Sequence, residues 1–119
     1  MKLVTAIIRP ERLEAVQEAL RAVLDEEDRY RLTVDSVEGH GASQGEVEIF
    51  RGQRIRPRLA PKTRITIAVN DAYLEKTIAA IVAGARTDGG GAVGDGKIFV
   101  QALEDVVRIR TGERGRDAI

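Results

Sequence analysis

The sequence KLVTAIIRPERLEAVQEALRAVL, residues 2–24, contains a change of hydrophobic period that decides the fold. Residues 2–9 are almost continuously apolar and rich in β-branched side chains, which is typical of a buried strand. Pro10 ends this strand, because proline lacks the N–H that a ladder needs. From Leu13 the apolar residues recur every three or four positions, so residues 11–24 are predicted to form an amphipathic helix.

Three further strands and a second helix are expected downstream. Strand-like sequences are found at residues 32–39, 63–71 and 97–103, and helical periodicity at residues 72–86. Asp71 is predicted to cap the second helix. The order β-α-β-β-α-β is that of a ferredoxin-like sandwich, an α+β fold with two helices on one face of a sheet. We therefore expect one domain over residues 1–119; a fold of this class does not by itself specify a function.

The apolar positions of these elements predict a small core. In the strand 32–39 the side chains expected to face inward are Leu32, Val34 and Val37. In the second helix the expected buried face consists of Leu74, Ile78, Ile81 and Val82. Aromatic residues make up 3% of the chain, so the core depends on aliphatic side chains. Small domains of this kind often bury further surface by forming oligomers.

The composition excludes several classes of function. Lys and Arg number 19 and Asp and Glu also 19, so no net field favours nucleic acid or a membrane surface. The absence of cysteine removes disulfides, thiolate catalysis and zinc–thiolate sites. A single histidine, His40, argues against a metal cluster, and its position between two glycines argues against a general base. No signal peptide or membrane span is evident, and a cytoplasmic protein is expected.

Before the last main strand, residues 89–100 read GGGAVGDGKIFV. Glycines allow backbone N–H groups to approach an oxyanion, and a lysine adds a positive charge, so Gly94, Gly96 and Lys97 suit a phosphate. The alternative is an ordinary turn, shaped by Asp95 through bonds to the backbone. A Walker A loop is excluded because Ile98 stands where Ser or Thr is needed. A Rossmann loop is excluded because these glycines precede a strand instead of a helix.

Two arginines follow in the short sequence VRIR, residues 107–110, which is predicted to be a last strand. Residues two apart in a strand face the same side, so Arg108 and Arg110 are expected to project together. Paired guanidinium groups suit phosphate recognition. The alternative is a strand edge with solvated arginines.

The sequences MKLVTAIIRP, GDGKIFV and VVRIRTGERGRDAI resemble the nitrogen-regulatory PII signal-transduction proteins, and the resemblance runs nearly end to end. It implies a homotrimer that binds ATP or ADP, with Mg²⁺ as a companion ion, in clefts between subunits. It also implies that residues 40–61 form a protruding T-loop, which docks onto a target, and that residues 87–97 form the phosphate-binding B-loop. The implied targets are an ammonium transporter or a metabolic enzyme.

The resemblance assigns ligand-binding roles residue by residue. The implied nucleotide-binding positions are Thr33, Gly39, Gly41, Ala42, Ser43, Lys62, Thr66, Ala68, Gly94, Asp95, Gly96, Lys97, Arg108 and Arg110. Of these, Arg108 and Arg110 are expected to reach the phosphates of the adjoining subunit. Lys62 corresponds to the lysine near the 2-oxoglutarate site. Arg51 and Arg54 lie in the T-loop and are expected to contact the target.

The chain departs from the family pattern at the base of the T-loop. It reads GHGASQG, so Ser43 replaces a glutamine that helps to hold Mg²⁺ and 2-oxoglutarate, and Ala42 replaces a phosphate-contacting arginine. Binding of 2-oxoglutarate is therefore expected to be weak. Ile55 stands where many members carry the tyrosine that is uridylylated.

These observations favour a regulatory adenine-nucleotide sensor with no catalytic residue. In such a sensor, ATP and ADP stabilise different T-loop arrangements, and the T-loop engages or releases its target. Two alternatives stay open at this point. One is a small phosphohydrolase or phosphotransferase on the same fold, and the other is a binder of a different small metabolite.

Overall fold

The computed structural model describes residues 1–24, 31–40, 48–50, 53–55 and 59–119. The elements are β1 (Lys2–Ile8), α1 (Leu13–Leu24), β2 (Thr33–Gly39), β3 (Glu48–Phe50), β4 (Gln53–Ile55), β5 (Ala60–Val69), α2 (Leu74–Ala85) and β6 (Gly96–Ala102). Short 3-10 helices lie at Pro10–Arg12, Asp71–Tyr73 and Gly115–Ala118. The first two lead directly into α1 and α2.

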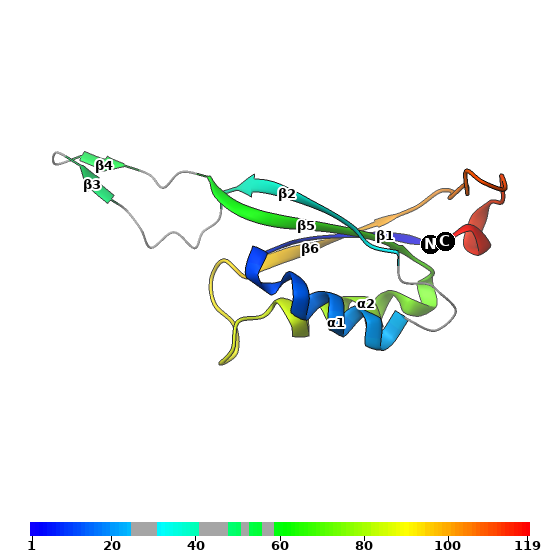
Figure 1. Ribbon diagram of the computed structural model, residues 1–119, viewed down its shortest axis with the longest axis horizontal. Coiled ribbons are helices and arrows are strands. Elements are labelled where there is room, and N and C mark those ends of the chain that lie inside the picture. Colours follow the sequence, from blue (N-terminus) through cyan, green and yellow to red (C-terminus); the bar gives the residue numbers. More distant parts are fainter. Residues whose placement is uncertain (25–30, 41–47, 51–52, 56–58) are drawn as a thin grey trace.

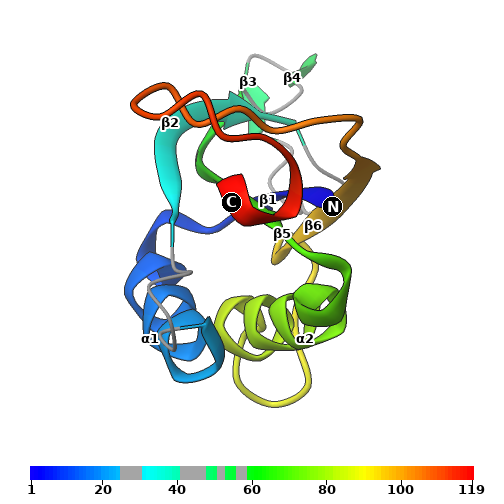
Figure 2. The same ribbon diagram turned by 90° about the vertical axis from the view of Figure 1, so that its right-hand side faces the viewer.

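Four strands form an antiparallel sheet in the order β2-β5-β1-β6. Both helices cover one face of this sheet, as Figure 2 shows. The predicted α+β, ferredoxin-like fold is confirmed. The strands β3 and β4 pair separately as a hairpin, which lies beyond the ends of β2 and β5 (Figure 1).

The core lies between the two helices and the alternate residues of the central strands. The buried aliphatic residues are Val4, Ala6, Ile8, Val16, Leu20, Leu24, Ile65, Ile67, Val69, Ala80, Ile81 and Ala85. This pattern follows from period two in the strands and from the three- and four-residue spacing in the helices. The intervening strand residues face away from the helices. We call this second surface the open face; it carries Leu3, Thr5, Ile7, Thr66, Ala68 and Phe99.

The two helices pack closely against each other, and this shifts the buried face of α2. A Cβ placed on Gly84 would come 2.7 Å from Cα of Val16, so the helices meet at a glycine. The buried residues of α2 are Thr77, Ala80, Ile81, Gly84 and Ala85. Of the predicted face only Ile81 is fully buried. Leu74, Ile78 and Val82 are half-buried, because the close contact with α1 selects the stripe of small residues.

Three local predictions are wrong. Val37 lies opposite Lys62 while its neighbour Ser36 lies opposite the buried Thr63, so Val37 is on the open face. The side chain of Asp71 does not cap a helix; it accepts a hydrogen bond of 2.8 Å from the amino group of Met1.

The third concerns residues 107–110, which form no strand. A single bridge joins Val107 to Arg114, and Gly112 N donates to Arg108 O at 2.8 Å. Gly112 has φ +72°, so the segment turns back instead of extending. The two arginines therefore do not share a strand face.

Candidate functional site

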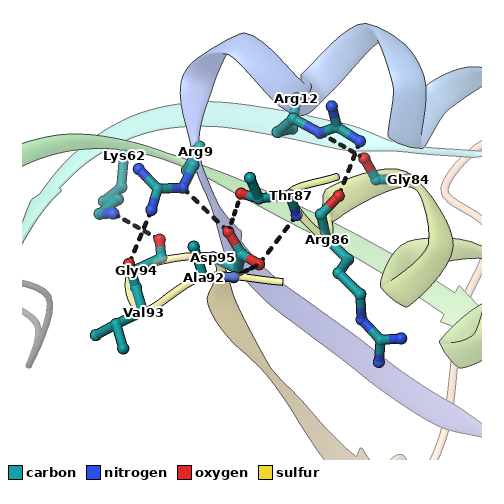
Figure 3. Close-up of polar contacts among 10 residues, drawn as sticks. All are labelled: Arg9, Arg12, Lys62, Gly84, Arg86, Thr87, Ala92, Val93, Gly94 and Asp95. Atoms are coloured by element: carbon teal, nitrogen blue, oxygen red, sulfur yellow. Dashed lines mark hydrogen bonds and ion pairs between the residues drawn. The ribbon is translucent and has the colours of Figure 1, made fainter. Parts of the chain in front are cut away.

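The connection between α2 and β6, residues 86–95, is here called the glycine loop. Asp95 lies at its centre and accepts four hydrogen bonds (Figure 3). Oδ2 accepts from the backbone N–H groups of Thr87 at 3.0 Å and Ala92 at 2.9 Å. Oδ1 accepts from the hydroxyl of Thr87 and from Nε of Arg9 at 3.1 Å. Both ends of the loop are thus joined through one carboxylate.

Two basic side chains hold the loop from outside. Arg9, which follows β1, also donates from Nη2 to the carbonyl of Val93 at 2.8 Å. Lys62, near the start of β5, donates from Nζ to the carbonyl of Gly94 at 3.0 Å (Figure 3). The stem of Lys62 runs beside Gly39, whose added Cβ would lie 3.8 Å from Lys62 Cγ. The structure therefore brings together the predicted residues Gly39, Lys62 and Gly94.

The environment of Asp95 strongly favours its ionised form. The hydroxyl of Thr87 does most to hold the pKa of Asp95 well below its usual range, followed by the N–H groups of Ala92 and Thr87. A carboxylate offers about four acceptor positions, and these four donors use them. Asp95 thus shapes the loop through these hydrogen bonds, as expected if the glycine-rich sequence is an ordinary turn. Its predicted contact with a nucleotide stays a prediction.

Gly96 and Lys97 begin β6 directly after the loop. Gly96 has φ +111°, and an added Cβ would lie 1.7 Å from the carbonyl oxygen of Ile7. Pairing of β6 with β1 therefore requires this glycine whether or not a ligand binds. Lys97 lies opposite Ile7 in the ladder and is exposed, on the same face as the predicted residues Thr66 and Ala68.

The predicted nucleotide-binding residues Thr33, Thr66 and Ala68 lie further along the open face. Thr33 pairs with Thr66, and Thr66 in turn pairs with Thr5 of β1. Ala68 lies opposite Leu3. Ala68 lies six positions after Lys62 in β5, which corresponds to roughly 20 Å along the strand. The predicted residues thus follow one face of the sheet from the glycine loop toward its far end.

On the helical side, a cleft of about 280 Å³ opens between α2 and the start of β6. Its lining residues are Ile8, Ile81, Val82, Ala85, Arg86, Asp95, Gly96, Lys97 and Ile98. The floor is mainly aliphatic, and charged residues stand at the end near the glycine loop. Of the predicted site residues that the structure describes, Asp95, Gly96 and Lys97 line this cleft.

Arg108 and Arg110 lie far from the glycine loop of the same chain. The loop adjoins the first residue of β6, whereas the arginines follow its last residue, Ala102; the strand between spans roughly 20 Å. Figure 1 shows the glycine loop and the C-terminal segment at opposite ends of the sheet. A phosphate on the loop and these arginines therefore cannot meet within one copy of the chain.

Arg108 is held by its own C-terminal segment. Its Nη1 lies 2.5 Å from Oε2 of Glu113, and its Nη2 donates to the carbonyl of Asp117 at 2.9 Å. The side chain of Arg110 is exposed and makes no hydrogen bond or ion pair with the part of the chain that the structure describes. Lys97 and the Arg108 segment thus lie at opposite ends of β6.

The remaining predictions concern the 40–61 segment and metal binding. Gly41, Ala42, Ser43 and Arg51 lie outside the described residues, and Arg54 lies in β4, of which the backbone is described. His40 is exposed. Within the described ranges, no group of three or more His, Cys, Asp and Glu side chains is placed to hold a metal ion. In the same ranges, no helix is long and apolar enough to cross a membrane.

Sequence reasoning missed the roles of Arg9 and Thr87. Arg9 follows a strand and Thr87 follows a helix, positions at which polar residues are ordinary. Their contacts with Asp95 span 86 and 8 residues of chain. The pairing of Arg9 with Asp95 arises because β1 and β6 are neighbours in the sheet. The contact between Arg9 and Asp95 could have been predicted from the sequence only through the strand order, which places the end of β1 beside the start of β6.

Comparison with known proteins identifies the family. The family model of nitrogen regulatory protein P-II matches residues 1–113. The chain is 51% identical to nitrogen regulatory protein GlnK1 of Methanosarcina mazei over 119 residues, covering 100% of this chain and 97% of that protein. It is 43% identical to nitrogen regulatory protein P-II of Rhodospirillum rubrum, with 100% of both chains covered. The chain therefore belongs to the P-II family of nitrogen regulatory proteins.

Proposed function

We propose that this protein is a regulatory sensor of ATP and ADP that acts as a homotrimer. The glycine loop and Lys97 of one subunit bind the phosphates, and Arg108 and Arg110 of a neighbouring subunit complete the site. The 40–61 segment then engages a target, either a transporter of the ammonium type or an enzyme of nitrogen metabolism. Membership of a family of nitrogen regulatory proteins agrees with the prediction of a regulator instead of an enzyme.

One observation carries the nucleotide-binding part of this proposal. The glycine loop is already folded by the hydrogen bonds of Asp95, Arg9 and Lys62, and it presents the exposed Lys97 at the start of β6. A loop that is held in one conformation before binding loses little further entropy when it receives a polyanion.

The arrangement of positive groups supports the trimer. Lys97 lies at the start of β6 and Arg108 beyond its end, so a shared phosphate requires two copies of the chain. The open face supplies the surface for association, because it carries the aliphatic residues Leu3 and Ile7 and the half-exposed Phe99. A sheet with helices on one side leaves such a face to be covered by other copies.

Calorimetric titration of the Lys97→Ala variant tests the site. Loss of one charge-assisted contact is expected to weaken ATP and ADP binding by roughly ten- to a hundredfold. Lys76→Ala, which removes an exposed lysine from α2, is the matched control and should bind as the parent does. Equal affinities for Lys97→Ala and the parent would show that the glycine loop is not a phosphate site.

For 2-oxoglutarate we propose weak coupling to nucleotide binding. Ser43 is shorter than the glutamine that the resemblance places there, whereas Lys62 keeps one positive partner for a carboxylate. Titrations of MgATP with and without 2-oxoglutarate at millimolar concentration are expected to differ by less than about threefold. Tenfold tightening would show that another group, such as Gln44, has taken the place of the missing side chain.

A further inference from the structure

We propose that Asp95 is a positioning residue. Its carboxylate, acting through Thr87, Ala92 and Arg9, sets the shape of the glycine loop before any ligand arrives. This inference deepens the function proposed above and, in its effect on nucleotide affinity, rests on it.

The glycine content of the loop makes such an anchor necessary. Gly89, Gly90 and Gly91 all have positive φ values, +88°, +99° and +95°, in succession. A Cβ on either of the first two would meet nothing within 4 Å, so packing does not define their conformation. Glycine loses more backbone entropy on ordering than any other residue. The order of this segment must therefore come from contacts at its two ends.

Asp95 supplies these contacts from inside the loop. Oδ2 accepts from the N–H groups of Thr87 and Ala92, which stand on either side of the three glycines. Two further backbone bonds, Gly91 N to Thr87 O at 2.9 Å and Asp95 N to Ala92 O at 3.2 Å, close the same ring. Oδ1 accepts from the Thr87 hydroxyl and from Arg9, which connects the ring to the end of β1.

A direct role for this carboxylate in binding a metal ion or a phosphate fits the geometry less well. All its acceptor positions are directed at donors of the protein, and its negative charge would repel a phosphate. An anchor that fixes a loop before binding lowers the entropy that the ligand must overcome. The expected signature of losing this anchor is thus faster amide exchange in the glycine loop together with a loss of nucleotide affinity.

The test compares Asp95→Asn with Asp88→Asn in the full-length protein. Asparagine keeps the shape of the side chain but offers one carbonyl oxygen, so it cannot serve both pairs of donors. Asp88 is exposed in the same loop and makes none of the hydrogen bonds found in the described residues. Two quantities are measured: amide hydrogen exchange at Thr87 and Ala92 without ligand, and the calorimetric affinity for ADP.

For Asp95→Asn we expect exchange at both amides to accelerate by about tenfold or more and ADP affinity to fall by about tenfold. Asp88→Asn should leave both unchanged. Thr87→Ser, which keeps the hydroxyl, should bind ADP within about twofold of the parent, whereas Thr87→Val should resemble Asp95→Asn. Rescue by serine but not by valine would show that the hydrogen bond from the hydroxyl to Asp95, and not the volume of the side chain, sets the loop.

The outcomes distinguish this inference from the proposed function. If the parent binds neither ATP nor ADP, the proposed function fails, and the exchange measurement alone decides the role of Asp95. Unchanged exchange at Thr87 and Ala92 in Asp95→Asn overturns the inference in every case. Unchanged ADP affinity in that variant, with a parent that binds, also overturns it.

Discussion

At the scale of single residues, Gly96 shows how a sequence motif can serve structure and site together. The resemblance assigned it to nucleotide binding, and the structure adds a reason that is independent of any ligand. Its Cα faces the carbonyl of Ile7 so closely that a Cβ would lie 1.7 Å from the oxygen. The pairing of β6 with β1, and hence the position of Lys97, depends on this contact.

We predict that Gly96→Ala destabilises the protein by roughly 2–5 kcal/mol, from backbone strain at positive φ and from overpacking against β1. Gly89→Ala is the matched control, because Gly89 also has a positive φ but has open space around it. It should cost about 1–2 kcal/mol from strain alone. Chemical denaturation measures both variants; equal losses would contradict the close contact.

The lowered pKa values of two carboxylates, Asp35 and Asp71, lead to a prediction of how stability depends on pH. The hydrogen bond from Arg64 lowers the pKa of Asp35, and contacts with the amino group of Met1 and with Lys2 lower the pKa of Asp71. Groups with lowered pKa values stabilise the fold above their unfolded pKa, and this contribution disappears as the pH falls through the folded pKa. The free energy of unfolding should therefore change little from pH 7 to about 5 and decrease below about pH 4.

Urea denaturation at several pH values tests this expectation with Asp35→Asn. The free energy of unfolding of this variant should fall less steeply with decreasing pH than that of the parent. The reason is that the variant lacks the Asp35 carboxylate, which takes up a proton when the parent unfolds in acid. Glu18→Gln, an exposed change on α1, should keep the slope of the parent. A parent whose stability rises as the pH falls from 5 to 3 would contradict the assigned ion pairs.

At the scale of elements, the crossing of α1 and α2 depends on a glycine. The Cβ of an alanine at position 84 would lie 2.7 Å from Val16 Cα and 2.9 Å from Ala15 O. We predict that Gly84→Ala forces the helices apart and destabilises the protein by roughly 1–3 kcal/mol. Ala83→Ser, on the exposed side of α2, should change stability by less than about 0.5 kcal/mol. Thermal and urea unfolding compare the two variants.

Arg12 joins the same pair of helices to the glycine loop. Its guanidinium donates to the carbonyls of Gly84 at 2.9 Å and Arg86 at 3.0 Å, which belong to the last turn of α2 and the residue after it (Figure 3). These carbonyls lie at the C-terminal end of α2, where the helix supplies no further backbone N–H groups to bond with them. The cation also suits the negative end of the helix dipole. The orientation in which α2 enters the glycine loop is thus set from the 3-10 helix Pro10–Arg12, which leads into α1.

At the scale of the whole molecule, the open face leads to a prediction about assembly. Light scattering at micromolar concentration should give three times the chain mass of 13.0 kDa. Phe99, with 50% of its surface exposed, lies on this face, so Phe99→Lys should shift the equilibrium toward monomers. Ala22→Lys, at an exposed position of α1 on the helical side of the sheet, is the control. A monomeric parent would remove the shared site and the nucleotide proposal with it.

Much of the fold could be predicted from the strand–helix pattern of residues 2–24 and from the recurrence of that pattern in the second half of the chain. Strand and helix periods are local properties, so they identify the elements and most of the buried residues without knowledge of the partners. Some errors occurred where a tertiary contact decides. Gly84 turns the small-residue stripe of α2 toward α1, and the amino group of Met1 binds the side chain of Asp71, which was predicted to cap α2. The bend after residues 107–110 is instead local, because Gly112 has a positive φ and donates to Arg108 O.

The sequence by itself determined the order of elements, the glycine-rich connection and the chemical types of the candidate residues, because these depend on neighbours along the chain. Only the tertiary structure decided which of them meet. Strand order brings Arg9 to Asp95 and Lys62 to Gly94, and the length of β6 keeps Lys97 away from Arg108. Such pairings depend on how strands line up in the sheet, and no local pattern of residues records that alignment.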